Sequence, residues 1–241
     1  LKCFCLDKIE ILRVKFIESN AFSECSSLKK IIIPSTAKKI NDNAFSGCSS
    51  LEEILIPSSV EYLGERIFDD IEHVNITGNI EYISKKMFYN NELLEFITIP
   101  SSVSSINDYS FYGCSSLKEI DISSSVKTIG KYAFYGCESL KQLIIPSSVK
   151  FIGSHAFENC SNLIQLTLDS NISKIKHNTF YNCSSLKEVS IPPSLTCVSK
   201  NVFVGVTSIN ITGNPMYINC LFDGCSTLTH ITIPSSVTSI K

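Results

Sequence analysis

Ten phenylalanines recur along the chain at a nearly constant spacing, and this spacing constrains the fold more than any other feature. They are Phe22, Phe45, Phe68, Phe88, Phe111, Phe134, Phe157, Phe180, Phe203 and Phe222. The successive spacings are 23, 23, 20, 23, 23, 23, 23, 23 and 19 residues. A fixed period of this size is typical of repeat architectures, in which one structural unit is copied along an axis.

The segment around each Phe follows one template, clearest in residues 133–153: A-F-x-x-C-x-S-L-x-x-I-x-I-P-x-S-V-x-x-I-G. The part L-x-x-I-x-I ends in an apolar-polar-apolar alternation, which predicts a strand with one buried face. A proline closes six of these strands, because it lacks the N–H that ladder pairing needs. These prolines are Pro34, Pro57, Pro100, Pro146, Pro192 and Pro234. We predict eleven strands, beginning at Leu6, Leu28, Leu51, Ile71, Leu94, Leu117, Leu140, Leu163, Leu186, Val206 and Leu228.

The rest of the template completes one coil of the chain. V-x-x-I predicts a second short extended piece on the opposite side, and A-F-x-x-C predicts a single helical or 3₁₀ turn that directs Phe inward. One unit cannot bury its own apolar face, so the units are expected to stack. The predicted fold class is therefore a repeat solenoid, mainly β, with a parallel sheet on one side. With about 4.8 Å per strand step, the rod would be on the order of 50 Å long.

Two repeats are shorter than the others, at residues 68–87 and 203–221. Both lose the C-x-S stretch and carry Thr-Gly-Asn where the proline would stand, at 77–79 and 212–214. The Leu/Ile register continues through both, so we interpret them as tightened coils rather than linkers. We accordingly expect residues 1–241 to form a single domain that begins and ends within a repeat, as a fragment of a longer protein would.

The template resembles the BspA-like leucine-rich repeats, a 23-residue class of bacterial and protist surface proteins. Near-verbatim copies lie at 44–64, 110–130 and 133–153, and the match covers essentially the whole chain. The resemblance implies a leucine-rich-repeat right-handed coil with a concave parallel sheet. It also implies a cell-surface or secreted protein that mediates attachment. The departures are the two short repeats and Asn91, which stands where the recurring Cys belongs.

Charge and hydropathy exclude several kinds of partner. The formal net charge is −2 with interspersed Lys and Glu, so no basic field attracts a nucleic-acid backbone and nucleic acid is not an expected partner. Apolar runs such as Ile31-Ile32-Ile33 are far shorter than the roughly 20 residues that cross a bilayer, so no membrane-spanning segment is expected.

Eight cysteines occupy the same template position: Cys3, Cys25, Cys48, Cys114, Cys137, Cys160, Cys183 and Cys225. Stacked parallel side chains do not offer the crossed Cβ vectors of a disulfide, so we expect buried thiols that pack as small hydrophobic groups. A spacing of 23 also differs from the close pairs of a zinc site, and we expect no metal and no cofactor. Cys5, Cys197 and Cys220 lie off this position, and Cys197 is expected to be exposed.

No catalytic arrangement is evident. The four histidines, His73, His155, His177 and His230, are scattered over different repeats, whereas nucleophilic catalysis needs its groups within hydrogen-bond reach. Serine is abundant but recurs in turn positions, where its hydroxyl satisfies local backbone groups. We therefore predict that the chain is not an enzyme.

The outward positions of the sheet are the candidate binding surface, since solenoids bind along an extended face. One row is Lys8, Lys30, Glu53, His73, Phe96, Glu119, Gln142, Gln165, Glu188, Ser208 and His230. The next row is Glu10, Ile32, Leu55, Asn75, Thr98, Asp121, Ile144, Thr167, Ser190, Asn210 and Thr232. The predicted ligand contacts are Ile32, Leu55, Phe96, Glu119, Asp121, Gln142, Ile144 and Gln165. Outward apolar groups can mark a contact patch, although ordinary strand propensity explains them equally.

Two further features leave alternatives open. Tyrosines near the Phe turn form either a second aromatic face or a cover for the convex flank: Tyr89, Tyr112, Tyr132, Tyr135 and Tyr181. Asn-x-Ser/Thr sequences begin at Asn75, Asn159, Asn171, Asn182 and Asn210, a number that chance also produces.

The leading functional hypothesis is a surface-displayed binding module without enzymatic activity. It would attach to protein or glycoprotein ligands of host matrix, host cells or other microbes through the face of the solenoid. The alternative is a structural spacer or self-associating stalk, because unpaired strand edges at solenoid ends can associate.

Overall fold

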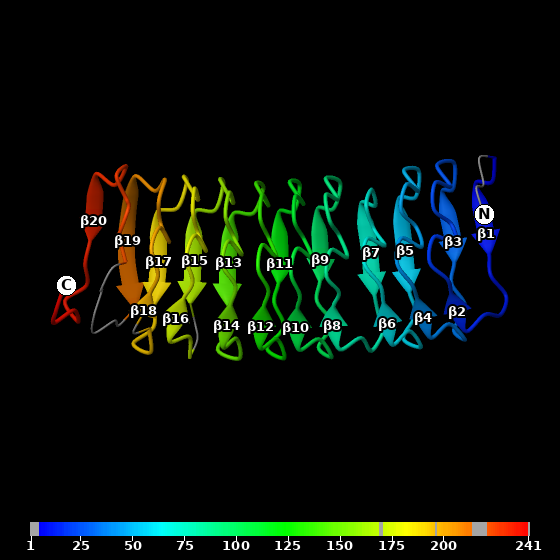
Figure 1. The fold of residues 1–241 in the computed structure, drawn as a ribbon, viewed down its shortest axis with the longest axis horizontal. Coiled ribbons are helices and arrows are strands. Elements are labelled where there is room, and N and C mark those ends of the chain that lie inside the picture. The colour runs from blue at the N-terminus through cyan, green and yellow to red at the C-terminus, as the bar shows by residue number, and fades with distance from the viewer. Residues whose placement is uncertain (1–4, 169–170, 196, 214–220, 241) are drawn as a thin grey trace.

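The fold is a rod of stacked coils, each carrying one strand on either side (Figure 1). The computed structural model describes residues 5–168, 171–195, 197–213 and 221–240. All strand pairs are parallel, and each strand pairs with its counterpart one coil away. The predicted mainly β solenoid is therefore confirmed.

One side of the rod carries eleven longer strands, as predicted from the template. They are β1 (Lys8–Glu10), β3 (Lys30–Ile32), β5 (Glu53–Ile56), β7 (His73–Ile76), β9 (Phe96–Thr98), β11 (Glu119–Asp121), β13 (Gln142–Ile145), β15 (Gln165–Leu168), β17 (Glu188–Ile191), β19 (Ser208–Gly213) and β20 (His230–Thr232). Each strand begins two residues after the Leu, Ile or Val at which we predicted its start. The last of these residues, Leu228, is only partly buried. The leucine itself ends the preceding turn, as at Leu51, whose N–H donates to the Cys48 carbonyl at 2.9 Å.

The opposite side carries two-residue strands, which confirm the second extended piece. They are β2 (Phe16–Ile17), β4 (Lys39–Ile40), β6 (Tyr62–Leu63), β8 (Tyr82–Ile83), β10 (Ser105–Ile106), β12 (Thr128–Ile129), β14 (Phe151–Ile152), β16 (Lys174–Ile175) and β18 (Cys197–Val198). The prolines open the corner between the two sides: the Pro57 carbonyl accepts the Val60 N–H at 3.0 Å, and the Pro146 carbonyl accepts the Val149 N–H at 3.0 Å.

The core is a set of ladders running along the rod. Eight of the ten repeating phenylalanines are less than 2% exposed, from Phe45 to Phe203. Neighbouring rings stack, with centroids 4.9 Å apart for Phe88 and Phe111 and 5.0 Å apart for Phe111 and Phe134. Phe22 is 9% exposed and Phe222 is partly buried. The interior predicted from the 23-residue spacing is confirmed.

The turn at Phe is not helical, contrary to the prediction, and the described residues contain no helix. Backbone N–H groups of the turn donate alternately to the next coil and within the turn. Phe111 N–H donates to the Ala133 carbonyl of the next coil, whereas Tyr112 N–H donates to the Tyr109 carbonyl of the same turn. Most of the described turns have two residues with positive φ, such as Tyr109 at 59° and Gly113 at 74°, whereas the turn at Phe68 has only Arg66. Because these left-handed residues redirect every second N–H toward the neighbouring coil, a continuous helix cannot form.

Serine hydroxyls bond between coils as well as locally. Ser102 Oγ donates to the Ile80 carbonyl of the preceding coil at 2.7 Å, and Ser125 Oγ donates to the Val103 carbonyl at 2.6 Å. Local turn bonds are also present: Ser110 Oγ donates to the Asn107 carbonyl at 2.7 Å, and Ser125 Oγ donates to Ser123 Oγ at 3.0 Å.

Asn91 replaces the ladder Cys after the first short repeat for a visible reason. Its side chain is fully buried, its Nδ2 donates to the Ile71 carbonyl at 2.9 Å, and its Oδ1 accepts the N–H groups of Leu93 and Leu94 at 3.1 Å each. Elsewhere a Cys Sγ reaches a Phe carbonyl of the preceding coil, as Cys114 does to Phe88 at 3.1 Å. The longer Asn amide satisfies a carbonyl that the shortened coil has displaced.

The pairing of strands along the rod is interrupted at defined places. The long strands form three sheets, which separate between β3 and β5 and between β11 and β13. The short strands separate between β6 and β8 and between β14 and β16. Since each interruption on one side lies where the other side is continuous, the stack of coils stays connected throughout these regions.

Candidate functional site

The sheet face, defined as the outward side chains of the eleven long strands, displays the two predicted rows. Strand pairing aligns His73 with Phe96 and Phe96 with Glu119, and it aligns Gln142 with Gln165. Inward side chains such as Ile54 and Leu143 are 1% exposed, so the alternation of the template separates core from surface as predicted.

The four predicted apolar contacts are exposed on this face: Ile32 by 38%, Leu55 by 53%, Phe96 by 47% and Ile144 by 62%. They do not form one patch. Ile32 and Leu55 lie on neighbouring strands of one row, whereas Phe96 lies in the other row and Ile144 four strands beyond Leu55. Lys118 covers part of Phe96, with Nζ 5.6 Å from the ring centroid, while bonded to Glu95 at 2.6 Å. The structure therefore brings together only the first pair.

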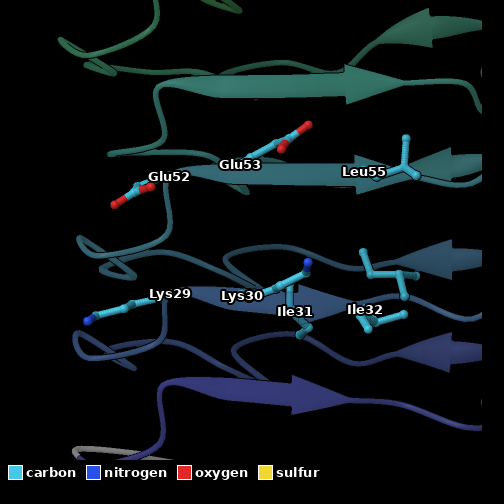
Figure 2. Close-up of a pocket in the computed structure, with 8 residues that line it drawn as sticks. Lys29, Lys30, Ile31, Ile32, Glu52, Glu53 and Leu55 are labelled. Carbon is cyan, nitrogen blue, oxygen red and sulfur yellow. The ribbon is translucent and has the colours of Figure 1, made fainter.

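A hollow opens beside Ile32 and Leu55, where the sheet is interrupted between β3 and β5 (Figure 2). Lys29 and Glu52 stand at the strand starts, and Lys30 and Glu53 follow them. This hollow combines two cations, two anions and two exposed aliphatic side chains. Such a mixture suits a protein surface of mixed polarity better than a small apolar ligand.

The second sheet interruption, between β11 and β13, divides the remaining predicted contacts. Glu119 and Asp121 are exposed on one side, and Gln142 and Ile144 are exposed on the other. A hollow here is lined by Glu119, Gln142 and two lysines, Lys118 and Lys141. Gln165, one strand further, is only half-exposed. The two hollows were not predicted, because no single residue type in the repeat signals a missing ladder.

One part of the predicted rows is wrong. β19 pairs with β17 through Glu188 and Asn210, two residues later than the predicted partner Ser208. It pairs with β20 in the predicted register, Ser208 with His230. With Thr212 in place of proline, β19 extends to Gly213 and contacts its two neighbours through different halves. In the other short repeat, Glu53 aligns with His73 as predicted.

The tyrosines near the Phe turn stack on one another. Tyr89, Tyr112 and Tyr135 form one column, with centroids 4.9 and 4.6 Å apart. Tyr109 and Tyr132 form a second column at 5.1 Å, which His155 continues at 4.4 Å. Burial raises the pKa of Tyr112 and Tyr132. Because the ring faces cover each other, this flank presents ring edges and hydroxyls, which favours the alternative in which the tyrosines cover the convex flank. Tyr181 is half-buried.

Two histidines lie closer together than the sequence indicated. The His155 and His177 rings meet edge to face with centroids 5.2 Å apart. Ser154 Oγ lies 3.4 Å from His177 Nδ1, whereas Glu158 contacts His155 Nδ1. The carboxylate and the hydroxyl thus contact different imidazoles, so these four groups do not form the linked Ser–His–acid relay of a hydrolase.

The ladder cysteines are buried thiols, as predicted for Cys25, Cys48, Cys114, Cys137, Cys160 and Cys183; Cys225 is half-buried. Burial raises the pKa of Cys160 to about 12 and raises that of Cys137 and Cys183 well above its ordinary value. Cys5 is exposed. Cys3, Cys220 and the side chain of Cys197 lie outside the described part of the chain, so the predicted exposure of Cys197 stays a prediction.

The described residues contain neither a metal site nor a membrane-spanning helix. No group of three or more His, Cys, Asp or Glu side chains is placed to hold a metal ion. Nor does the described chain contain a helix long and apolar enough to cross a bilayer.

Parallel coils of about 23 residues, a Leu/Ile/Phe core and an open sheet face define the class: a leucine-rich repeat solenoid. The model of the BspA type leucine rich repeat region matches residues 1–118, 104–219 and 205–241, with six copies. The chain belongs to this family. No curated protein matches the sequence.

Solved structures of bacterial proteins are similar to the chain. A leucine-rich repeat protein from Bacteroides ovatus is 27% identical, with a TM-score of 0.64 over 98% of this chain and 74% of that one. The leucine rich repeat protein of T. pallidum is also 27% identical, with a TM-score of 0.53 over 83% of this chain and 81% of its own. The pneumococcal vaccine antigen PcpA, 24% identical, shares the fold with a TM-score of 0.54 over 86% of this chain and 63% of its own.

Proposed function

We propose that this protein is a non-enzymatic binding module, displayed on a cell surface or secreted, that adheres through its sheet face. Its ligands would be proteins or glycoproteins of host matrix, host cells or other microbes. The observation that carries the proposal is the pair Ile32 and Leu55, exposed side by side at the hollow between β3 and β5. Membership of the BspA type repeat family supports a binding role.

The chemistry of this hollow fits a protein partner. Exposed aliphatic side chains gain free energy when a partner removes them from water, by about 25 cal/mol per Å². Lys29, Lys30, Glu52 and Glu53 around them offer charges of both signs, which select a partner by electrostatic complementarity. Phe96, Glu119, Asp121, Gln142, Ile144 and Gln165 extend the proposed contact along the rod.

The test is binding of the chain to immobilised collagen, laminin and fibronectin, measured by surface plasmon resonance. We expect Ile32→Lys with Leu55→Lys to weaken binding at least about tenfold, because a central apolar contact is replaced by charge. Phe16→Lys is the matched control, since Phe16 is 51% exposed but lies on the opposite side in β2. It should change the affinity less than about twofold.

Two results would contradict the proposal. One is absence of binding to all three matrix proteins and to intact host or microbial cells. The other is an equal loss of affinity in the control variant, which would place the contact away from the sheet face. End-to-end association in sedimentation without any ligand binding would instead support the stalk alternative.

A further inference from the structure

A third hollow lies on the opposite side of the rod, where the pairing of the short strands is interrupted between β14 and β16. Its lining includes Lys131, Lys174 and Lys176, with Asp108 as the one acidic residue among the described residues around it. The Asp108 carboxylate already accepts the backbone N–H of Lys131 at 2.7 Å. The hollow therefore carries a local excess of positive charge although the whole chain is slightly acidic.

The three ammonium groups are not neutralised by the protein. The described residues contain no ion pair between any of these lysines and a carboxylate. Lys127 and Lys150 are both exposed and lie on neighbouring coils, where Lys150 N–H donates to the Lys127 carbonyl at 2.8 Å. Unpaired cations gathered on one surface raise the local concentration of anions.

The template changes at this interruption. Gly153 approaches the preceding coil so closely that a Cβ there would lie 2.5 Å from Lys131 N and 2.6 Å from the Gly130 carbonyl carbon. In the next coil the same template position is Lys176, and β16 pairs with β18 but not with β14. A side chain at this position does not by itself prevent pairing, since β10, which Asn107 follows, pairs with β8. The residue that replaces glycine here supplies one of the charges of the hollow.

The other interruption of the short strands also follows a coil with glycine at this position. Gly64 precedes Ser84 at this template position, and the ladder stops between β6 and β8. There the Ser84 hydroxyl donates to the Leu63 carbonyl and is buried, so that gap is filled. Lys176 is only half-buried and leaves its hollow open to a ligand.

The hollow also offers contacts other than charge. Phe151 is 45% exposed, and Lys176 Nζ lies 5.5 Å from its ring centroid. The hydroxyls of Ser154 and Ser199 line the same space. An aromatic ring beside hydroxyls and ammonium groups suits a sugar ring that carries anionic substituents, because C–H groups pack on the ring while sugar hydroxyls form hydrogen bonds.

We propose that this hollow binds the sulfate or carboxylate groups of an acidic polysaccharide. The lysines belong to coils on both sides of β14, and each coil adds about 4.8 Å along the rod, so their charges are distributed along the rod axis. A chain with recurring anionic groups matches this distribution. Lysine ammonium groups act as point charges, which sulfates and carboxylates accept without a fixed bidentate geometry.

The test uses the full chain with heparin as the sulfated probe and chemically desulfated heparin as the carboxylate probe. We expect K131Q/K174Q/K176Q to weaken heparin binding at least about tenfold and to lower the slope of log Kd against log salt concentration by about one per lysine. F151A should weaken binding several-fold without altering that slope, because it removes no charge.

The matched control is K38Q/K39Q/K85Q, which removes the same number of charges from the same side of the rod, in other coils. Circular dichroism and thermal unfolding would verify that all variants remain folded. The control should bind heparin within about twofold of the parent. Loss of binding to desulfated heparin assigns the site to sulfate groups, and retention assigns it to carboxylates.

Three outcomes would overturn the proposal. They are no heparin binding at low salt, equal losses in the test and control variants, or equally tight binding of a DNA duplex, which would indicate a general polyanion surface. The sheet-face substitutions at Ile32 and Leu55 should leave heparin binding intact. The polysaccharide site and the proposed adhesive function are therefore tested independently, and either proposal can be contradicted without the other.

Discussion

At the residue scale, the Phe ladder shows how one side chain serves two coils. The Phe134 ring is fully buried and stacks on Phe111 at 5.0 Å and on Phe157 at 5.1 Å. Its carbonyl accepts the Sγ–H of Cys160 at 3.4 Å. Loss of the ring would therefore leave a cavity between neighbouring coils that the stacked backbone cannot close.

We expect Phe134→Ala to lower the free energy of unfolding by about 3–5 kcal/mol, the cost of truncating a buried Phe. Urea denaturation followed by circular dichroism measures this. Phe151→Ala is the control: its ring is 45% exposed, and the loss should stay below about 1 kcal/mol. Similar losses in the two variants would contradict the ladder as the main source of stability.

At the element scale, three coils place a glycine directly after a short strand, against the preceding coil. Gly64, Gly130 and Gly153 each lie so close to the preceding coil that a Cβ would fall within 2.6 Å of a backbone atom. At all three the short strands pair: β6 with β4, β12 with β10, and β14 with β12. Glycine serves close approach at these three positions and not an unusual φ, whereas coils with Asn107 or Ser199 at this template position pair as well.

Gly153→Ala should therefore destabilise the protein by about 1–3 kcal/mol, the range for overpacking, and separate β14 from β12. Hydrogen exchange of the Gly153 amide, which donates to the Ile129 carbonyl at 2.8 Å, would report the separation as faster exchange. Gly136→Ala is the comparison, since a Cβ there meets nothing nearer than 3.8 Å and only its φ of 71° is strained. Unchanged exchange at Gly153 would refute the steric argument.

At the scale of the whole molecule, the buried thiols link stability to alkaline pH. Burial raises the pKa of Cys160 to about 12 and that of Cys137 and Cys183 well above the ordinary thiol value. In the unfolded chain each thiol loses its proton near pH 8.5. Unfolding above that pH therefore releases protons, so stability that is present below about pH 8.5 is lost as the pH rises toward the folded pKa.

We expect the urea midpoint to fall steadily between pH 8 and pH 10, with a contribution approaching about 1.4 kcal/mol per pH unit for each ladder thiol. Replacing Cys137 and Cys160 by Ala should lower stability at pH 7 but flatten this decline. A midpoint independent of pH in the parent protein would contradict the assignment. Labelling with a thiol reagent at pH 8 should meanwhile modify exposed Cys5 much faster than the ladder cysteines.

The 23-residue period determined on its own which residues stack, and hence the solenoid, the Phe and Cys ladders and the rows of the sheet face, except where β19 meets β17. A one-dimensional repeat has this property because equivalent positions of successive coils must meet in space. The turn at Phe was misjudged because its Gly and Asn residues signal positive φ, which excludes the predicted helical turn.

Only the tertiary structure decided where neighbouring coils separate. Short strands pair in the coil of Gly153 but also in those of Asn107 and Ser199, so the residue at one template position does not determine whether two coils pair. The tertiary structure also placed Ser154 beside His177, set the register of β19 against β17, and gathered lysines from separate coils around one hollow. The period specifies which residues are neighbours, but the contacts between coils set how closely they approach.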